Sequence, residues 1–216
     1  LRVVASMDDG IGRMLDYLKA EGLDENTIVI YTSDQGFFLG EHGWFDKRFM
    51  YEESLRMPFL VRYPPEIEPG TANEKMVLNT DFAPTFLHYA GLSVPVGMQG
   101  RSFRPLLGGH VPEDWRTSMY YRYWLHLAHH GVYAHYGVRT ERHKLIYYYA
   151  QALGTPGAID DSKPPEWELF DLQTDEAEMR SVYDEPAYST VADELKAELG
   201  RLRRAVGDED TPWSES

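Results

Sequence analysis

The chain has 216 residues, 43% of them apolar and 26% charged, which is typical of a globular protein long enough to bury a sizeable core. Its net charge is −14, from 21 basic and 35 acidic residues. Such a field repels phosphate backbones and anionic lipids, so we expect no nucleic-acid partner. The sequence has no cysteine, which excludes disulfides and thiolate metal sites, and no apolar run long enough to span a membrane.

The first elements alternate between helix and strand. Residues 8–21 predict a helix that Asp8 or Asp9 caps and Gly22 closes. Residues 27–32 form a short, almost wholly apolar run, which predicts a central strand covered by helices on both faces. A helix followed by a buried strand is typical of an α/β fold.

A long loop follows this strand. Residues 33–49 contain three glycines and show no clean periodicity, so they predict a loop at the carboxyl end of the strand, where α/β proteins bind ligands. Residues 50–55 predict a short helix and 58–63 a further strand. Residues 79–90 predict a helix with proline in its first turn and a glycine after its last residue.

The second half predicts a different architecture. Residues 92–112 are rich in glycine and proline, and we place a subdomain boundary there, dividing the chain into 1–110 and 111–216. Short aromatic or β-branched runs predict strands at 118–123, 136–140, 144–149 and 167–171. Residues 150–166 predict a surface loop, and 187–205 an amphipathic helix. These runs indicate a small antiparallel sheet with one helix packed on it.

The loop after the first strand carries the candidate chemistry. Asp34 and Gln35 follow the strand directly, and their carboxylate and amide oxygens suit a hard cation such as Ca²⁺ or Mg²⁺. Two ligands cannot complete such a site, so others must come from elsewhere. Lys47 and Arg48 on the same loop could bind a tetrahedral anion beside the metal, lysine as a point charge and arginine as a fork.

A plainer interpretation of these residues stands beside the first. Asp-Gln-Gly after a strand is commonly a turn in which the aspartate bonds nearby backbone N–H groups. His42 between two glycines is commonly an exposed loop histidine, and Lys47-Arg48 a solvated pair. The residues alone leave both interpretations open.

The order of these motifs is specific. Residues 26–63 contain Ser33-Asp34-Gln35-Gly36, then Gly40-Glu41-His42-Gly43, then Lys47 ahead of Tyr51-Glu52, then Pro58 and a strand. Looser matches continue at 79–85, at 98–102, at 136–140 together with Lys144-Leu145, and at 167–172. The whole series resembles the formylglycine-dependent sulfatase family of the alkaline-phosphatase-like superfamily. The resemblance implies an α/β fold: the C-terminal part of the α/β sheet of the catalytic domain (1–110), followed by a small antiparallel sheet with a packed C-terminal helix (111–216).

The resemblance also implies roles for five residues. Asp34 and Gln35 match the metal ligands, the metal usually being Ca²⁺, although Gln35 stands where histidine or asparagine is commoner. Lys47 matches the catalytic lysine that binds a sulfate oxygen. His42 belongs to the substrate-binding loop. His135 matches a substrate-contacting position of the C-terminal subdomain, with bracing of the following hairpin as the alternative.

The family's nucleophile is missing from this sequence. Relatives make formylglycine from the first residue of Cys/Ser-x-Pro-x-Arg, and the two Ser-x-Pro tripeptides here, at 93–95 and 162–164, lack the arginine. The early paired aspartates of the metal site are missing too, since Asp8-Asp9 lie at a predicted helix start, where capping explains them. We therefore expect the chain to be the C-terminal part of an enzyme more than twice as long, inactive without the N-terminal half of the same protein.

The resulting expectation is hydrolysis of a sulfuric ester on a small molecule or glycan. The tyrosine- and tryptophan-rich C-terminal part suggests a sugar. The alternatives are a phosphoester or phosphonate hydrolase of the same superfamily, a non-catalytic module that binds anionic carbohydrate, and a purely structural role for 109–216. The sequence does not decide the compartment; the family resemblance favours a periplasmic or secreted protein.

Overall fold

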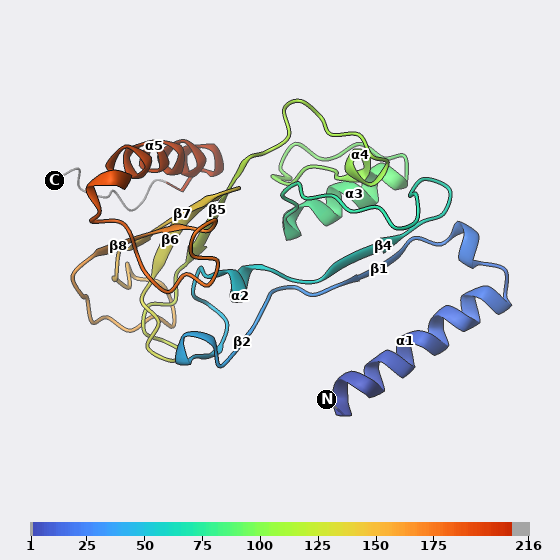
Figure 1. Cartoon of the computed structure of the whole chain (residues 1–216), viewed down its shortest axis with the longest axis horizontal. Coiled ribbons are helices and arrows are strands. Elements are labelled where there is room, and N and C mark those ends of the chain that lie inside the picture. The colour runs from blue at the N-terminus through green and yellow to red at the C-terminus, as the bar shows by residue number, and fades with distance from the viewer. Residues whose placement is uncertain (1, 209–216) are drawn as a thin grey trace. The chain divides into compact units, whose positions relative to one another are not determined.

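The computed structural model describes residues 2–208 and divides the chain into two compact units (Figure 1). The first unit consists of Leu1–Ser33 and Pro58–Glu113, and the second of Asp34–Met57 and Asp114–Ser216. We call Asp34–Met57 the site loop. It groups with the C-terminal residues, whereas the sequence-based division keeps it within 1–110; the assignment of 1–110 and 111–216 to two sulfatase domains stays a prediction.

Helix α1 opens the first unit and is longer than predicted. It covers Arg2–Ala20, so Asp8 and Asp9 lie inside the helix and the predicted N-cap is wrong. The reason is visible in the spacing, because Val4 and Met7 continue the helical apolar pattern toward the N-terminus. The predicted end is confirmed: the glycine after the helix has a φ of 66°.

Strand β1 (Val29–Thr32) pairs antiparallel with β4 (Phe59–Arg62). Both strands fall where the sequence predicts them. The predicted cover on both faces of β1 is not provided by residues 2–208, because Tyr31 remains 36% exposed and β1 pairs there with β4 alone. An apolar run predicts a strand, but it does not indicate which other elements cover that strand.

The other regular elements of the first unit are short helices joined by loops. A 3₁₀ turn at Asn79–Asp81 leads into α3 (Phe82–Tyr89), and α4 covers Arg104–Leu107. The buried Asp81 carboxylate accepts hydrogen bonds from the backbone N–H groups of Leu78 (2.8 Å) and Arg101 (2.7 Å), which fix the 3₁₀ turn that leads into α3.

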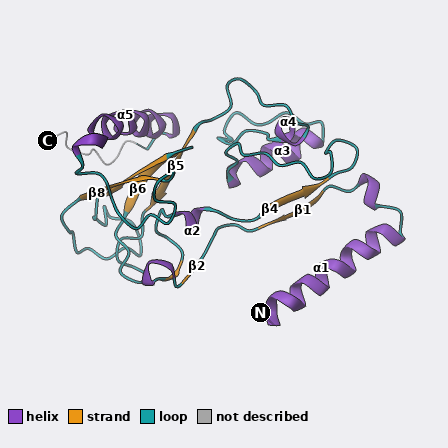
Figure 2. Ribbon diagram, viewed as in Figure 1, coloured by secondary structure: helices purple, strands orange, loops and turns teal. Residues whose placement is uncertain are grey.

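The second unit is built on a four-stranded antiparallel sheet in the order β5-β6-β7-β8 (Figure 2). The strands are Ser118–Tyr123, His135–Thr140, His143–Tyr148 and Glu166–Asp171. Helix α5 (Ser189–Val206) follows a short 3₁₀ turn and packs on the sheet. All four strands, the hairpin and the final helix confirm the sequence-based prediction.

The sheet has two covered faces. On one face Leu145 and Tyr147 of β7 pack with Leu199 of α5. On the other, Ile146 and Tyr148 pack with side chains of the site loop, Met50 among them. Alternate residues of one strand therefore hold α5 on one side and the site loop on the other.

The site loop contains short elements that the sequence does not predict. Strands β2 (Phe38–Leu39) and β3 (Phe45–Asp46) form a two-stranded ribbon with a 3₁₀ turn at Glu41–Gly43 between them. The predicted short helix is confirmed as α2 (Glu52–Leu55).

Among the helices of residues 2–208, none has the length and apolar character that crossing a membrane would require.

Candidate functional site

Gly36 packs its backbone directly on helix α2. Its N–H donates a 2.9 Å hydrogen bond to the carbonyl of Ser54. A Cβ atom at this position would lie 2.0 Å from the carbonyl oxygen of Glu53 and 2.5 Å from that of Arg56, so only glycine fits. Gln35, the preceding residue, is thereby fixed beside α2.

The chain that follows strand β3, at the other end of the ribbon, also contacts Ser54 of α2. The backbone N–H of Arg48 donates to the Ser54 hydroxyl at 3.2 Å. Gln35 and Lys47 each directly precede a residue that is bonded to Ser54, although twelve positions separate them in sequence. The structure thus brings together residues that the sequence shows only on one loop.

The Lys47 side chain has no partner within residues 2–208. It is half-buried, and its ammonium forms neither an ion pair nor a hydrogen bond with any of them; the same holds for the Gln35 amide. Arg48 differs, because its guanidinium is paired with the Asp46 carboxylate and is no longer available as an anion fork. An unneutralised lysine on a chain of charge −14 is suited to bind an anion.

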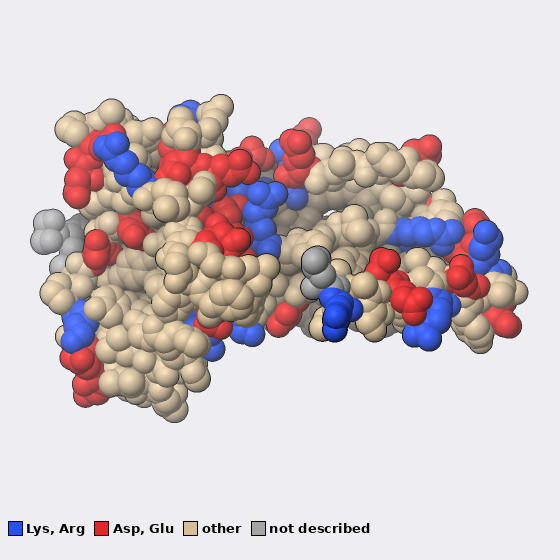
Figure 3. All heavy atoms as spheres, turned by 60° about the horizontal axis from the view of Figure 1, so that its bottom comes forward, with Lys and Arg blue, Asp and Glu red and all other residues tan. Residues whose placement is uncertain are grey.

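The face of the molecule drawn in Figure 3 shows no broad anion-binding area. Acidic and basic side chains are mixed on it, without an extended cationic surface. On this face an anionic ligand would be recognised by single cations.

Asp34 and Gln35 supply part of a donor set for a hard cation. Asp34 is exposed and Gln35 half-buried, and their side chains offer a carboxylate and an amide oxygen from adjacent positions. No group of three or more histidine, aspartate or glutamate side chains able to hold a metal exists within residues 2–208. The two residues fit Ca²⁺ as a partial ligand set, which further ligands from elsewhere would have to complete.

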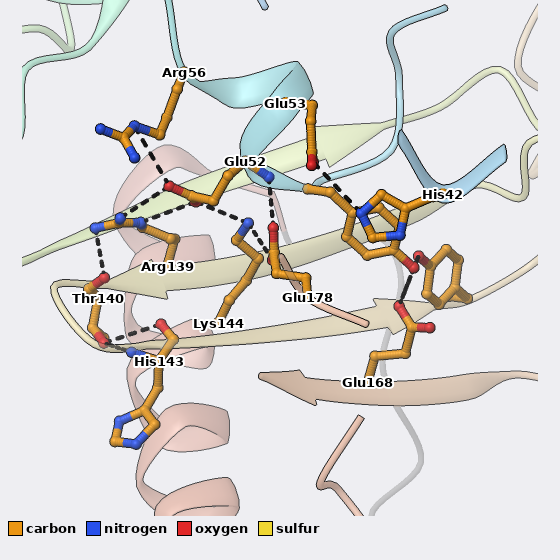
Figure 4. Close-up of polar contacts among 12 residues, drawn as sticks. His42, Glu52, Glu53, Arg56, Arg139, Thr140, His143, Lys144, Glu168 and Glu178 are labelled. Atoms are coloured by element: carbon orange, nitrogen blue, oxygen red, sulfur yellow. Dashed lines mark hydrogen bonds and ion pairs between the residues drawn. The ribbon is translucent and has the colours of Figure 1, made fainter. Parts of the chain in front are cut away.

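A buried ion network anchors helix α2 to the sheet (Figure 4). The fully buried Lys144 of β7 places its Nζ 2.9 Å from Glu52 Oε1 and 2.6 Å from Glu178 Oε1. Glu178 also accepts the backbone N–H of Glu52 at 2.6 Å. Arg139 of β6 completes the network, with its Nη2 3.1 Å from Glu52 Oε2.

The two carboxylates of this network differ in their pKa. Burial raises the pKa of Glu52, but Lys144 and Arg139 more than offset this effect, so the net shift is downward. Burial raises the pKa of Glu178, which Lys144 offsets only in part. Sequence reasoning missed this network: both Glu52 and Lys144 stand in motifs that resemble the family, but nothing in the spacing pairs residues so far apart.

His42 is not the exposed loop histidine of the plainer interpretation. Its backbone is left-handed, with a φ of 54°, and its half-buried ring stacks on Tyr51 with the centroids 4.7 Å apart. Its Nε2 lies 3.6 Å from Glu53 Oε2. His42 therefore fastens the ribbon to α2, and its role in substrate binding stays a prediction.

Another carboxylate, that of Glu168, contacts Tyr51 of the site loop. Glu168 of β8 accepts hydrogen bonds from the hydroxyl groups of Tyr51 (2.9 Å) and Tyr148 (3.0 Å). Burial raises the pKa of Glu168. The sequence gives no sign of this contact, because Glu168 stands in an ordinary strand pattern.

His135 is completely buried in the face of the sheet that carries the site loop. Its Nδ1 lies 2.7 Å from the carbonyl oxygen of Tyr133, and its ring lies 5.0 Å from that of Tyr148 and 6.2 Å from that of Phe49. Burial lowers the pKa of His135 to about 4, so the ring is neutral near pH 7. Full burial favours the bracing interpretation, while contact with a substrate stays a prediction.

Solved structures define the class of protein. The chain is similar to BT4656, described in complex with its substrate D-glucosamine-2-N,6-O-disulfate, with a TM-score of 0.86 and 45% identity over 96% of this chain and 40% of that one. It is also similar to a phosphonate monoester hydrolase from Silicibacter pomeroyi, with a TM-score of 0.76 and 28% identity over 94% of this chain and 39% of that one. The fold is that of the alkaline-phosphatase-like hydrolases, among them the sulfatases.

Sequence comparison narrows this class to a family. Residues 40–205 match the family described as N-sulphoglucosamine sulphohydrolase, C-terminal, and the chain belongs to it. An N-acetylglucosamine-6-O-sulfatase from Bacteroides thetaiotaomicron is 44% identical over 218 residues, which cover 100% of this chain and 37% of that protein. The predicted sulfatase resemblance is confirmed, and the chain spans little more than a third of this curated relative.

Proposed function

We propose that the protein containing this chain hydrolyses sulfate esters of an amino sugar. The observation that carries the proposal is that Gly36 and Arg48, which directly follow Gln35 and Lys47, both bond Ser54, while the Lys47 ammonium has no partner among residues 2–208. The similarity to BT4656, which binds a sulfated glucosamine, supports the choice of substrate.

In this proposal Lys47 is the catalytic cation of the chain. It binds a sulfate oxygen and offsets the charge that develops in the transition state. Asp34 and Gln35 hold Ca²⁺, with Mg²⁺ as the alternative; the ion, when bound, would polarise the sulfate group. His42 lies in the substrate-binding loop, and His135 supports it from β6.

The nucleophile belongs to another part of the protein. The chain lacks cysteine and any Ser-x-Pro-x-Arg motif, so we propose that a formylglycine in an N-terminal part completes the site. The chain alone then does not turn over substrate. We further propose a periplasmic or secreted location, which cell fractionation tests.

A phosphonate or phosphate ester hydrolase is the second candidate, favoured by the likeness to the Silicibacter pomeroyi enzyme. A phosphate monoester carries one more negative charge than a sulfate ester near neutral pH. Arg48 is neutralised by Asp46, and Arg56 approaches Glu52 at 4.0 Å, which leaves Lys47 as the cation without a partner on the described site loop. A single cation without a partner favours a monoanionic ester, which a sulfate ester and a phosphonate monoester both are, over the dianion of a phosphate monoester.

The test uses the full-length protein that carries this chain. We expect it to release sulfate from N-acetylglucosamine 6-sulfate faster than phosphate from the matched 6-phosphate. Lys47→Ala lowers turnover at least tenfold, whereas Lys163→Ala, at a surface ion pair, leaves it unchanged. Unchanged kinetics for Lys47→Ala would rule out its role, faster phosphate release would favour the second candidate, and binding without turnover would favour a carbohydrate-binding module.

A further inference from the structure

The backbone directly after Lys47 adopts a conformation that L-residues avoid. Arg48 has a φ of 141°, far from the regions that side chains with a Cβ allow. Such a residue persists only where its surroundings hold it in place, and such residues concentrate at functional sites. The direction of the Lys47 side chain depends on the backbone conformation at Arg48.

Among the contacts of Arg48, three hold its N–H, its side chain and its carbonyl separately. Its N–H donates to the Ser54 hydroxyl of α2 at 3.2 Å, and its guanidinium pairs with Asp46 of β3. Its carbonyl oxygen accepts a 2.8 Å hydrogen bond from the hydroxyl of Tyr121. The first two partners belong to the site loop itself, whereas Tyr121 reaches it from strand β5 of the sheet.

Tyr121 is well placed to act as a fixed donor. It lies opposite Gly137 in the register of β5 and β6, and its ring is 5.8 Å from that of His135. Burial raises the pKa of Tyr121 to about 12, so its hydroxyl keeps its proton at neutral pH. A rigid strand thus supplies the hydrogen bond to a strained loop.

We infer that Tyr121 is a positioning residue, which holds the carbonyl of Arg48 and thereby directs the Lys47 ammonium at the sulfate group. The inference rests on the proposed function of Lys47. Tyr121 itself touches no reacting atom; it acts through Arg48, the residue that follows the catalytic lysine.

The test compares two substitutions that each remove one buried hydroxyl. Tyr121→Phe frees the Arg48 carbonyl, whereas Tyr149→Phe removes a hydroxyl that donates to the carbonyl of Tyr123 within the same sheet, at 3.2 Å. In the full-length protein we expect Tyr121→Phe to lower kcat for the sulfate ester about tenfold, since misplaced groups lose much of their effect. Tyr149→Phe changes kcat by less than about twofold.

A double-mutant cycle separates positioning from folding. In a Lys47→Ala background, Tyr121→Phe should cause no further loss of kcat, because the group that it positions has been removed. An equal loss in both backgrounds, or equal losses for Tyr121→Phe and Tyr149→Phe, would overturn the inference.

Hydrogen exchange gives a readout that needs no activity. Tyr121→Phe, but not Tyr149→Phe, should raise amide exchange over residues 46–50. A full-length protein without sulfatase activity would refute the proposed function. In that protein, raised exchange at 46–50 would still support the Tyr121 tether, and unchanged exchange would overturn it.

Discussion

The two faces of the C-terminal sheet are covered in different ways. Helix α5 covers one face through a regular apolar stripe, with Leu195 and Leu199 buried against the strands. The site loop covers the other with short elements, backbone in sparsely populated regions at His42 and Arg48, and polar contacts to distant residues. Apolar packing covers the α5 side, whereas the site-loop side combines an apolar cluster around Met50 with specific polar bonds.

This difference between the two faces predicts which substitutions change stability alone and which also change activity. Apolar burial is non-directional and tolerates small shifts, whereas the polar contacts fix individual atoms beside Lys47. We expect substitutions on the α5 side to change the free energy of unfolding, and those on the loop side to change kinetics as well. The predictions below test that division in the full-length protein.

The largest effect is expected for Lys144→Met. It leaves the carboxylate of Glu178 buried without its cation and Glu52 with only its arginine partners, which should cost about 3–5 kcal/mol of unfolding free energy. Lys163→Met, at an exposed pair with Asp161, should leave the unfolding free energy close to that of wild type. Urea unfolding measures both; similar values for the two would mean that the buried network does not hold α2.

Leu199→Ala tests the opposite face. Its side chain is fully buried in the α5 core, so truncation should cost about 3 kcal/mol. Val206→Ala, at a side chain that is 37% exposed, should cost less than about 0.5 kcal/mol. Below its unfolding transition, Leu199→Ala should keep kcat/KM within about twofold of wild type; a larger loss would remove the distinction between the faces.

Gly36→Ala should combine both effects. The added methyl meets backbone atoms of α2, which cannot move as a side chain can, and we expect a cost of about 2–3 kcal/mol with a loss of kcat. Gly97→Ala is the control, because a Cβ there meets no atom within 4 Å. Equal unfolding free energies for the two variants would contradict the close approach of Gly36 to α2.

The smallest predicted effect is on the pH dependence of stability. The pKa of His135 falls from an ordinary 6.5 to about 4 on burial, so the unfolded chain binds a proton first as the pH falls. Stability from this residue is therefore present above about pH 6.5 and should decline by about 2 kcal/mol by about pH 4.5. His135→Phe should flatten this part of the profile, whereas His110→Gln, at an exposed histidine, should leave it unchanged. A profile unaltered by His135→Phe would mean that the ring is not buried in its neutral form.

The same division explains what the sequence predicts. The strands of the sheet and α5 follow from apolar spacing, because local periodicity and burial agree there. The motifs on the site loop identify Asp34, Gln35 and Lys47 as candidates. The sequence does not predict that Gly36 and Arg48, the neighbours of these candidates, both bond Ser54, since this depends on a glycine contact and a hydroxyl bond that spacing does not encode.

Contacts between the loop and the sheet are the least predictable. In the sequence, Lys144 is one residue of a predicted strand, and Tyr121 is one of several aromatic residues in another. Their roles depend on partners far away in sequence: Lys144 pairs with Glu52, and Tyr121 bonds Arg48. The start of α1 was misplaced for a simpler reason, because two acidic residues resembled a cap while the apolar pattern continued past them.

A crystal structure of the full-length protein with Ca²⁺ and a sulfated glucosamine tests the central claim most directly. We predict oxygen atoms of Asp34 and Gln35 at about 2.3–2.6 Å from the ion, with the Lys47 ammonium hydrogen-bonded to a sulfate oxygen. Asp34 and Gln35 directed into solvent or bonded only within their own turn, with Lys47 remote from the sulfate, would contradict the account.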